Sequence, residues 1–183
     1  MTLPRFEYLA PQTLQEACAL LISHRGQAQV MTGGTDLLPK MKDRILTPRY
    51  VIGLRSIGGL DYVREDEQGL KIGALATLAQ VAETPEVVRD FPLLAAAILE
   101  VASVQIRNIG TVAGNLCNAS PSADTAPALI VMGAKVKLLN ADGKNRMLPV
   151  EDFFVGPGKT ALQEGELLEE IQVPKPLAGS GGA

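Results

Sequence analysis

The sequence has few of the side chains that bind metals or form nucleophile–base pairs. Its 183 residues include only two cysteines, Cys18 and Cys117, and one histidine, His24. The cysteines lack C-x-x-C spacing, so the chain cannot by itself ligate an iron–sulfur cluster or build a Cys/His zinc site. A Ser–His–Asp or Cys–His mechanism would have to use His24, which ends an apolar helical segment, and is therefore disfavoured.

Long runs of one residue class are also missing. The net charge is −3 and there is no basic run, which argues against nucleic acid or acidic lipid as a partner. The nearest basic cluster, Lys40, Lys42 and Arg44 with Asp43 among them, is interpreted as a solvated helix face. No apolar run could span a bilayer and the N-terminus has no signal-peptide core, so we expect a cytoplasmic protein without membrane insertion.

The common nucleotide-binding fingerprints are absent as well. The pattern G-x-G-x-x-G does not occur. Residues 156–160 read GPGKT but lack the first glycine and the upstream strand of a P-loop. A Rossmann domain and a P-loop NTPase are therefore both disfavoured.

What the sequence does contain is a stretch of small residues from Gln105 to Leu129. Between Asn108 and Pro127, Gly, Ala, Ser and Thr supply half of the positions, and Asp124 is the only charged residue. Small side chains leave backbone N–H groups open to a neighbouring molecule. We predict an open loop here, followed by a helix that Asp124 caps, with Pro127 in its first turn. That arrangement suits a bound anion or dinucleotide.

A second glycine-bearing turn follows a strand predicted at 28–32. The strand breaks at Gly33-Gly34, and Thr35-Asp36 can cap the next helix. The geometry is that of a phosphate-type turn, although a Gly-Gly turn joins a strand to a helix in many domains for structural reasons alone. The segments 32–36 and 110–115 together predict a site where peptide dipoles, rather than Lys or Arg, meet the charge of one elongated phosphate-bearing ligand.

The order of elements predicts two lobes. Strands alternating with helices in the first 55 residues indicate a small α/β lobe. Hairpins predicted within 61–74 and 135–148 indicate antiparallel pairing after it. The predicted division is 1–56 and 57–176, with the tail 177–183 disordered or a linker. Further helices are predicted to begin near residues 77, 92, 125 and 149, and a last strand at 167–173.

Three ordered blocks of the sequence match a known family: MTGGTDLLPKMK, IRNIGTVAGNLCNASPSADTAPAL, and FFVGPGKT followed by GELLEEIQVP. In order and spacing they resemble the FAD-binding medium subunit of molybdenum hydroxylases, the family of xanthine dehydrogenase and aerobic carbon monoxide dehydrogenase. The resemblance spans nearly all of residues 3–176. It implies an α+β, two-lobed fold, in which a small α/β lobe precedes a larger lobe with a mainly antiparallel sheet and flanking helices. FAD would lie extended between the lobes.

The resemblance also implies which residues bind FAD. Gly33 and Gly34 would leave backbone free to meet the pyrophosphate, and Asp124 would hold the ribityl or phosphate-linked region, serve as a bare helix cap, or do both. Val101, Ala102 and Leu168 fall where the family lines the flavin or adenine, but apolar residues there could equally be core. The full set carried over is Val30, Met31, Thr32, Gly33, Gly34, Thr35, Asp36, Leu37, Val101, Ala102, Thr111, Val112, Ala113, Gly114, Asn115, Asp124 and Leu168.

The sequence departs from the family pattern at two points. Ala113 stands where the family usually has a second glycine, which would narrow the space beside the phosphate by one methyl group. Family members also continue beyond Pro176 into a C-terminal lobe that covers part of the isoalloxazine. The chain is therefore interpreted either as a fragment or as a subunit whose missing lobe another chain supplies.

The function implied by the resemblance is electron transfer. A partner small subunit with [2Fe–2S] clusters would deliver single electrons from a molybdopterin-bearing large subunit, and FAD would collect two before reducing NAD⁺ or another acceptor. No side chain is nominated as catalytic. Two alternatives stay open: a same-fold flavin oxidoreductase acting directly on an organic substrate, for which no proton donor is evident, and a non-catalytic scaffold that only holds partner subunits together.

Overall fold

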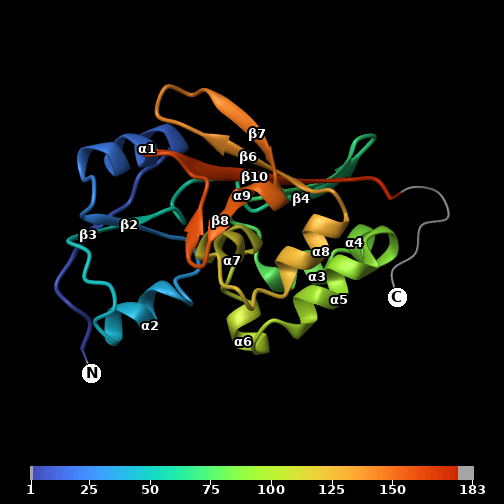
Figure 1. The fold of residues 1–183 in the computed structure, drawn as a ribbon, viewed down its shortest axis with the longest axis horizontal. Coiled ribbons are helices and arrows are strands. Elements are labelled where there is room, and N and C mark those ends of the chain that lie inside the picture. Colours follow the sequence, from blue (N-terminus) through green and yellow to red (C-terminus); the bar gives the residue numbers. More distant parts are fainter. Residues whose placement is uncertain (1, 177–183) are drawn as a thin grey trace.

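A computed structural model describes residues 2–176 of the chain. The first part is a parallel three-stranded sheet in the order β1-β3-β2, joined through two helices (Figure 1). Thr13 begins the first helix, because its hydroxyl accepts from the backbone N–H of Glu16 at 3.1 Å. These elements are β1 (Glu7–Leu9), α1 (Leu14–Ser23), β2 (Ala28–Met31), α2 (Leu37–Lys42) and β3 (Tyr50–Gly53).

The second part is a five-stranded antiparallel sheet in the order β4-β5-β10-β6-β7. The predicted hairpins form its two flanks, and the last strand inserts between them, pairing with β5 on one side and β6 on the other. The pairing of β10 with β6 shifts register between Leu168 and Glu170. The strands are β4 (Val63–Asp66), β5 (Gly69–Gly73), β6 (Lys135–Leu139), β7 (Asn145–Pro149) and β10 (Leu167–Pro174).

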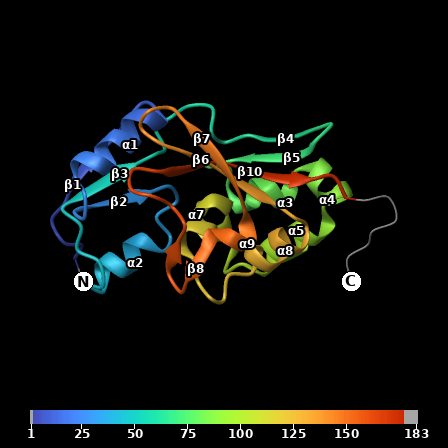
Figure 2. The ribbon, with the colours of Figure 1, turned by 45° about the horizontal axis from the view of Figure 1, so that its top comes forward.

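Helices cover one face of this sheet, as Figure 2 shows. The core between them contains Ile72, Leu138 and Ile171 from the strands and Leu94 and Ile98 from a helix, all fully buried. Pro85 and Pro92 each open a helix at its first turn. The helices and the remaining hairpin are α3 (Leu78–Glu83), α4 (Pro85–Asp90), α5 (Pro92–Glu100), α6 (Val104–Arg107), α7 (Val112–Asn118), α8 (Thr125–Val131), α9 (Val150–Phe153), β8 (Phe154–Gly156) and β9 (Lys159–Thr160).

A second core joins the two sheets. Cys18 on α1 is fully buried, and its thiol lies 3.4 Å from the carbonyl oxygen of Leu139 on β6. Burial raises the pKa of the Cys18 thiol to about 11, so it packs as an inert apolar group. Ile57 and Leu60 belong to the same core. The mixed fold is the predicted α+β class, whereas the lobe boundary near residue 57 stays a prediction and the tail 177–183 lies outside the described residues.

Candidate functional site

The turn after β2 leaves its peptide groups unpaired. Within residues 2–176, none of the backbone N–H groups from Thr32 to Leu37 donates to a protein acceptor. Gly34 adopts a left-handed backbone at φ +76°, which glycine permits at little cost. Consecutive free N–H groups in a glycine turn form a concavity that attracts anions.

The part of the stretch 105–129 that precedes residue 125 is not the open loop predicted from its small side chains, whereas the predicted helix after it is present. That part contains two short helices, α6 and α7, before α8. Ser103 and Thr111 begin them, since the Ser103 hydroxyl accepts from Ile106 N–H at 3.4 Å and the Thr111 hydroxyl from Gly114 N–H at 2.9 Å. The residues Thr111 to Asn115 therefore form the capped first turn of α7.

The two segments nevertheless meet in space. The hydroxyl oxygens of Thr32 and Thr111 lie 3.1 Å apart, across a sequence separation of 79 residues. A Cβ atom on Gly33 would lie 2.4 Å from the carbonyl oxygen of Ile109, so the backbones touch directly. A Cβ on Gly110 would lie 3.4 Å from the Thr35 hydroxyl. We call this contact, made by residues 32–37 and 109–114, the glycine seam.

Hydrogen bonds between side chains of α2 and α7 connect the two segments of the seam. The Lys40 ammonium donates to Asn118 Oδ1 at 2.6 Å, and the Asn118 amide donates to Asp36 Oδ1 at 3.0 Å. Asp36 therefore stands at the start of α2 without capping it, contrary to the prediction. The interpretation of Lys40 as part of a solvated face was also wrong, because it is half-buried and bonded to α7. Nothing in the local sequence signalled these long-range partners.

A third segment, the turn after α5, is held by an arginine that sequence reasoning missed. Ala102 has a left-handed backbone, φ +46°, which is uncommon for a residue with a side chain. The guanidinium of Arg107 donates to the carbonyl oxygens of Leu99, Val101 and Ala102 at 3.1, 2.9 and 3.3 Å. These bonds satisfy the carbonyl groups at the end of α5 and fix the turn. Val101 is buried and Ala102 is exposed.

The remaining predicted residues have mixed placements. Asp124 is exposed, and its side chain makes no capping bond to α8, so the predicted helix cap is wrong. The Asn115 side-chain oxygen accepts from the buried hydroxyl of Thr125 at 2.5 Å, which joins α7 to α8. Leu168 is buried in the larger core.

Ala113 is also buried in the larger core, with 3% of its surface exposed. Its methyl group therefore packs inside the protein, and the expectation that it narrows the space beside the phosphate stays a prediction. The remaining residues of the predicted set lie in the seam or next to it in sequence. Val30, Met31, Thr32, Gly33, Gly34, Thr35 and Leu37 are half-buried, and Val112 is fully buried.

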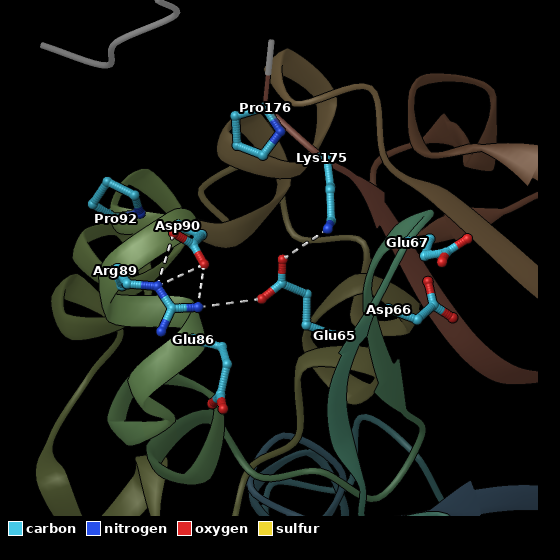
Figure 3. A pocket seen from close by; sticks show the side chains of 9 residues that line it. All are labelled: Glu65, Asp66, Glu67, Glu86, Arg89, Asp90, Pro92, Lys175 and Pro176. Carbon is cyan, nitrogen blue, oxygen red and sulfur yellow. Dashed lines mark hydrogen bonds and ion pairs between the residues drawn. The ribbon is translucent and has the colours of Figure 1, made fainter. Parts of the chain in front are cut away.

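Two groups of charged side chains away from the seam are paired with one another. A cavity of about 990 Å³ lies between the β4–β5 hairpin and α4, where Glu65 faces Arg89 at 3.5 Å and Lys175 at 3.7 Å (Figure 3). Asp90 in the same cavity pairs with Arg89 at 2.5 Å. Among residues 2–176, no three His, Cys, Asp or Glu side chains are grouped so that they could hold a metal ion.

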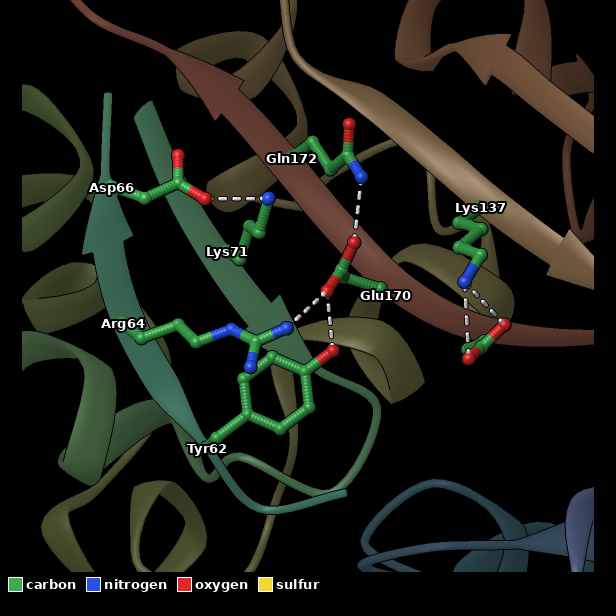
Figure 4. Close-up of polar contacts among 8 residues, drawn as sticks. Tyr62, Arg64, Asp66, Lys71, Lys137, Glu170 and Gln172 are labelled. Carbon is green, nitrogen blue, oxygen red and sulfur yellow. Dashed lines mark hydrogen bonds and ion pairs between the residues drawn. The ribbon is translucent and has the colours of Figure 1, made fainter. Parts of the chain in front are cut away.

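The uncovered face of the five-stranded sheet carries a second set of paired groups (Figure 4). Glu170, almost fully buried, accepts from the Tyr62 hydroxyl and from the Gln172 amide, the latter at 2.6 Å. Burial and the Glu170 carboxylate raise the pKa of Tyr62, so the phenol stays protonated. Lys137 pairs with Glu169 at 3.2 Å. We call these residues, with Arg64, the paired face.

A family model described as the FAD binding domain in molybdopterin dehydrogenase matches residues 4–176. The chain belongs to this family. It is 37% identical over 180 residues to the carbon monoxide dehydrogenase medium chain of Hydrogenophaga pseudoflava, which covers 98% of this chain and 62% of that one. It is 34% identical over 179 residues to the caffeine dehydrogenase subunit beta of Pseudomonas sp. (strain CBB1), covering 97% and 60%. The chain thus spans about three fifths of the length of these relatives.

Solved structures agree with the family assignment. Carbon monoxide dehydrogenase from Hydrogenophaga pseudoflava superposes with a TM-score of 0.94 at 37% identity, covering 98% of this chain and 62% of that one. UDP-N-acetylenolpyruvylglucosamine reductase from Thermus caldophilus, at 20% identity and a TM-score of 0.53, covers 92% of this chain and 56% of that one and shares the fold alone.

The cofactor of this family is FAD, and the glycine seam fits a diphosphate in two respects. The peptide N–H groups from Thr32 to Leu37 are unpaired donors, and Gly33 lets its backbone pass directly against that of Ile109. The only carboxylate in the first segment, Asp36, is already engaged by Asn118. None of the helices described for residues 2–176 has the length and apolar character that a bilayer crossing requires.

Proposed function

We propose that the chain binds FAD with its diphosphate against the glycine seam and serves as the electron-transfer module of a molybdenum hydroxylase. One observation carries the proposal: two turns far apart in sequence meet through glycine backbone, and one of them offers a run of unpaired N–H groups. Unpaired donors in a half-buried turn lose hydrogen bonds to water, and an anion restores them.

The residues of the chain would bind and orient the cofactor. Peptide N–H groups from Thr32 to Leu37 would hold the diphosphate, while the Asp36–Asn118–Lys40 bridge keeps α2 and α7 in register. The Arg107-anchored turn at Val101 and Ala102 is the proposed boundary of the flavin or adenine. Bound FAD would supply the chemistry of taking single electrons from [2Fe–2S] clusters and passing pairs to NAD⁺ or another acceptor.

The proposed partners are a [2Fe–2S] small subunit and a molybdopterin-bearing large subunit, the latter setting the substrate. The named substrates of relatives differ, including carbon monoxide and caffeine. Genes adjacent to that of this chain on the chromosome identify the candidate subunits to co-express.

The test is flavin content followed by reduction. We expect the purified chain to be yellow, or to become so when incubated with FAD and desalted, with one FAD retained per chain. When the co-expressed [2Fe–2S] subunit is chemically reduced, the flavin absorption of the complex should bleach. A chain that stays colourless after reconstitution would instead support the scaffold, and a flavin reduced only by an organic substrate would support the same-fold oxidoreductase.

A further inference from the structure

The glycine seam contains a hydroxyl pair whose proton directions follow from its surroundings. Thr111 is 5% exposed, and its hydroxyl oxygen accepts from Gly114 N–H at 2.9 Å. The same oxygen lies 3.1 Å from the Thr32 hydroxyl oxygen. Among residues 2–176, the Thr111 hydroxyl makes no hydrogen bond besides these two.

A hydroxyl carries one proton to donate, and a buried one must place it on a neighbouring acceptor. The Gly114 N–H is itself a donor, so it cannot receive the Thr111 proton. Thr32 Oγ1 is the remaining neighbour, and it must therefore act as acceptor in this pair. The Thr32 proton is then directed away from Thr111. Thr32 is half-buried beside the unpaired N–H groups of its own turn, where its proton has no protein acceptor among the described residues.

We propose that Thr32 is a further ligand-binding donor of this site, whose hydroxyl hydrogen-bonds a phosphate oxygen of the bound dinucleotide because Thr111 fixes the direction of its proton. The inference rests on the proposed function. It adds a side-chain donor to the peptide N–H groups and explains why residue 114 is glycine. A Cβ there would lie 2.9 Å from the Thr111 hydroxyl and 3.0 Å from that of Thr32, so it would disturb the pair.

The experiment compares Thr32→Val, which removes the hydroxyl at nearly constant volume, with Thr32→Ser, which keeps it. Thr47→Val is the matched control, an exposed threonine in the same part of the chain. All are made in the full 183-residue chain. The dissociation constant for FAD is measured by flavin fluorescence, and the diphosphate of bound FAD is observed by ³¹P NMR at saturating FAD. Circular dichroism verifies that each variant is folded.

A hydrogen bond to a charged group predicts an FAD dissociation constant roughly 10- to 100-fold higher in Thr32→Val. We expect Thr32→Ser to stay within about threefold, because it keeps the charge-assisted bond, and Thr47→Val to match the parent chain. One ³¹P resonance should shift in Thr32→Val and neither in Thr47→Val. Unchanged affinity and unchanged ³¹P shifts in Thr32→Val would overturn the proposal.

Two further outcomes distinguish a hydroxyl donor at Thr32 from methyl packing and from a chain that binds no flavin. Equal losses of affinity in Thr32→Val and Thr32→Ser would point to packing of the methyl group and overturn a donor role. A parent chain that binds no FAD would overturn the proposed function itself. A parent chain that binds FAD while Thr32→Val binds equally well overturns the hydroxyl assignment alone.

Discussion

The glycine seam and the paired face are both polar, yet they are polar in opposite ways. On the paired face each charge has a protein partner, as Glu170 has Tyr62 and Gln172. In the seam the polar groups are peptide N–H groups and hydroxyls, and the peptide N–H groups from Thr32 to Leu37 are unpaired. A charge that already has a protein partner gains less from a ligand than an unpaired donor does. Under the proposed function, unpaired backbone N–H groups rather than a high density of charge mark the binding site.

The largest effect is expected from Gly33→Ala. The new Cβ would lie 2.4 Å from the Ile109 carbonyl oxygen and 2.9 Å from Gly110 Cα, both backbone atoms that cannot rotate away. We expect the seam to be forced apart, with a loss of about 3 kcal/mol in unfolding free energy and more than about 100-fold in FAD affinity. Urea denaturation and FAD titration measure the two. The matched control is Gly58→Ala, whose Cβ meets no atom within 4 Å. Normal FAD affinity in Gly33→Ala would place the diphosphate elsewhere.

A smaller loss is expected from Gly114→Val. Its Cβ would meet the Thr111 and Thr32 hydroxyls, which are side-chain atoms and can yield by rotation. We expect FAD occupancy after purification to fall severely, by roughly tenfold or more, with a lesser change in unfolding free energy. The ratio of flavin to protein absorbance gives the occupancy. Gly156→Val, at an open position, should leave it unchanged. Full flavin retention in Gly114→Val would refute the seam as the phosphate site.

Glu166→Gln tests a charge pair outside the seam. The Arg146 guanidinium, 2.8 Å from Glu166 Oε2, lowers the pKa of that carboxyl from its ordinary 4.5. A lowered pKa in the folded state means that the pair stabilises above the unfolded value and loses this contribution as pH falls through the folded value. Glu166→Gln should therefore be less stable than the parent chain at pH 7, with a gap that narrows below about pH 4. Urea denaturation across this range measures the gap.

The same variant should bind FAD as the parent chain does, because Glu166 lies outside the seam. A clear loss of FAD affinity in a folded Glu166→Gln protein would show that a paired charge outside the seam also contributes to FAD binding. A gap in stability that stays constant from pH 7 to pH 3 would show that the ion pair does not supply the difference.

The smallest effect is expected from Asp124→Ala. Asp124 is exposed and makes no capping bond, so its removal should change the unfolding free energy by less than about 0.5 kcal/mol. If Asp124 contacts the ribityl or phosphate-linked region, FAD affinity should still fall, but less than in Gly114→Val. Parallel FAD titrations of the two variants make the comparison. If Asp124→Ala loses more FAD affinity than Gly114→Val, the Asp124 side chain contributes more to binding than the backbone of the seam, contrary to the proposal.

The sequence predicted the elements whose signals are local. Alternating strands and short turns located both hairpins, and the Thr13 cap lies where the pattern placed it. The helices α6 and α7 were missed because neither cap is followed by the Glu or Gln of a capping box. In addition, α6 is only four residues long, and the small residues of α7 give little apolar periodicity. Asp36 and Asp124 were wrongly expected to cap. For Asp36 the reason is a partner 82 residues away, Asn118, which no local pattern reveals.

The candidate site shows the same limit. The Gly33-Gly34 turn could be predicted from its own residues, and a site shared with residues 110–115 from the glycines of both segments. The direct backbone contact of Gly33 with Ile109 was not predicted, because no local pattern marks it. The anchoring role of Arg107 was not predicted at all, because its acceptors are carbonyl groups, which every residue carries and no sequence pattern marks.

The central position of β10 has a consequence for synthesis of the chain. Among residues 2–176 this strand comes last in sequence, and it lies between two hairpins that the ribosome produces earlier. One edge of each hairpin stays unpaired until residues 167–174 leave the ribosome, because only then can β10 pair with both hairpins. Nascent chains released before that point would expose both edges and should be captured by chaperones or aggregate.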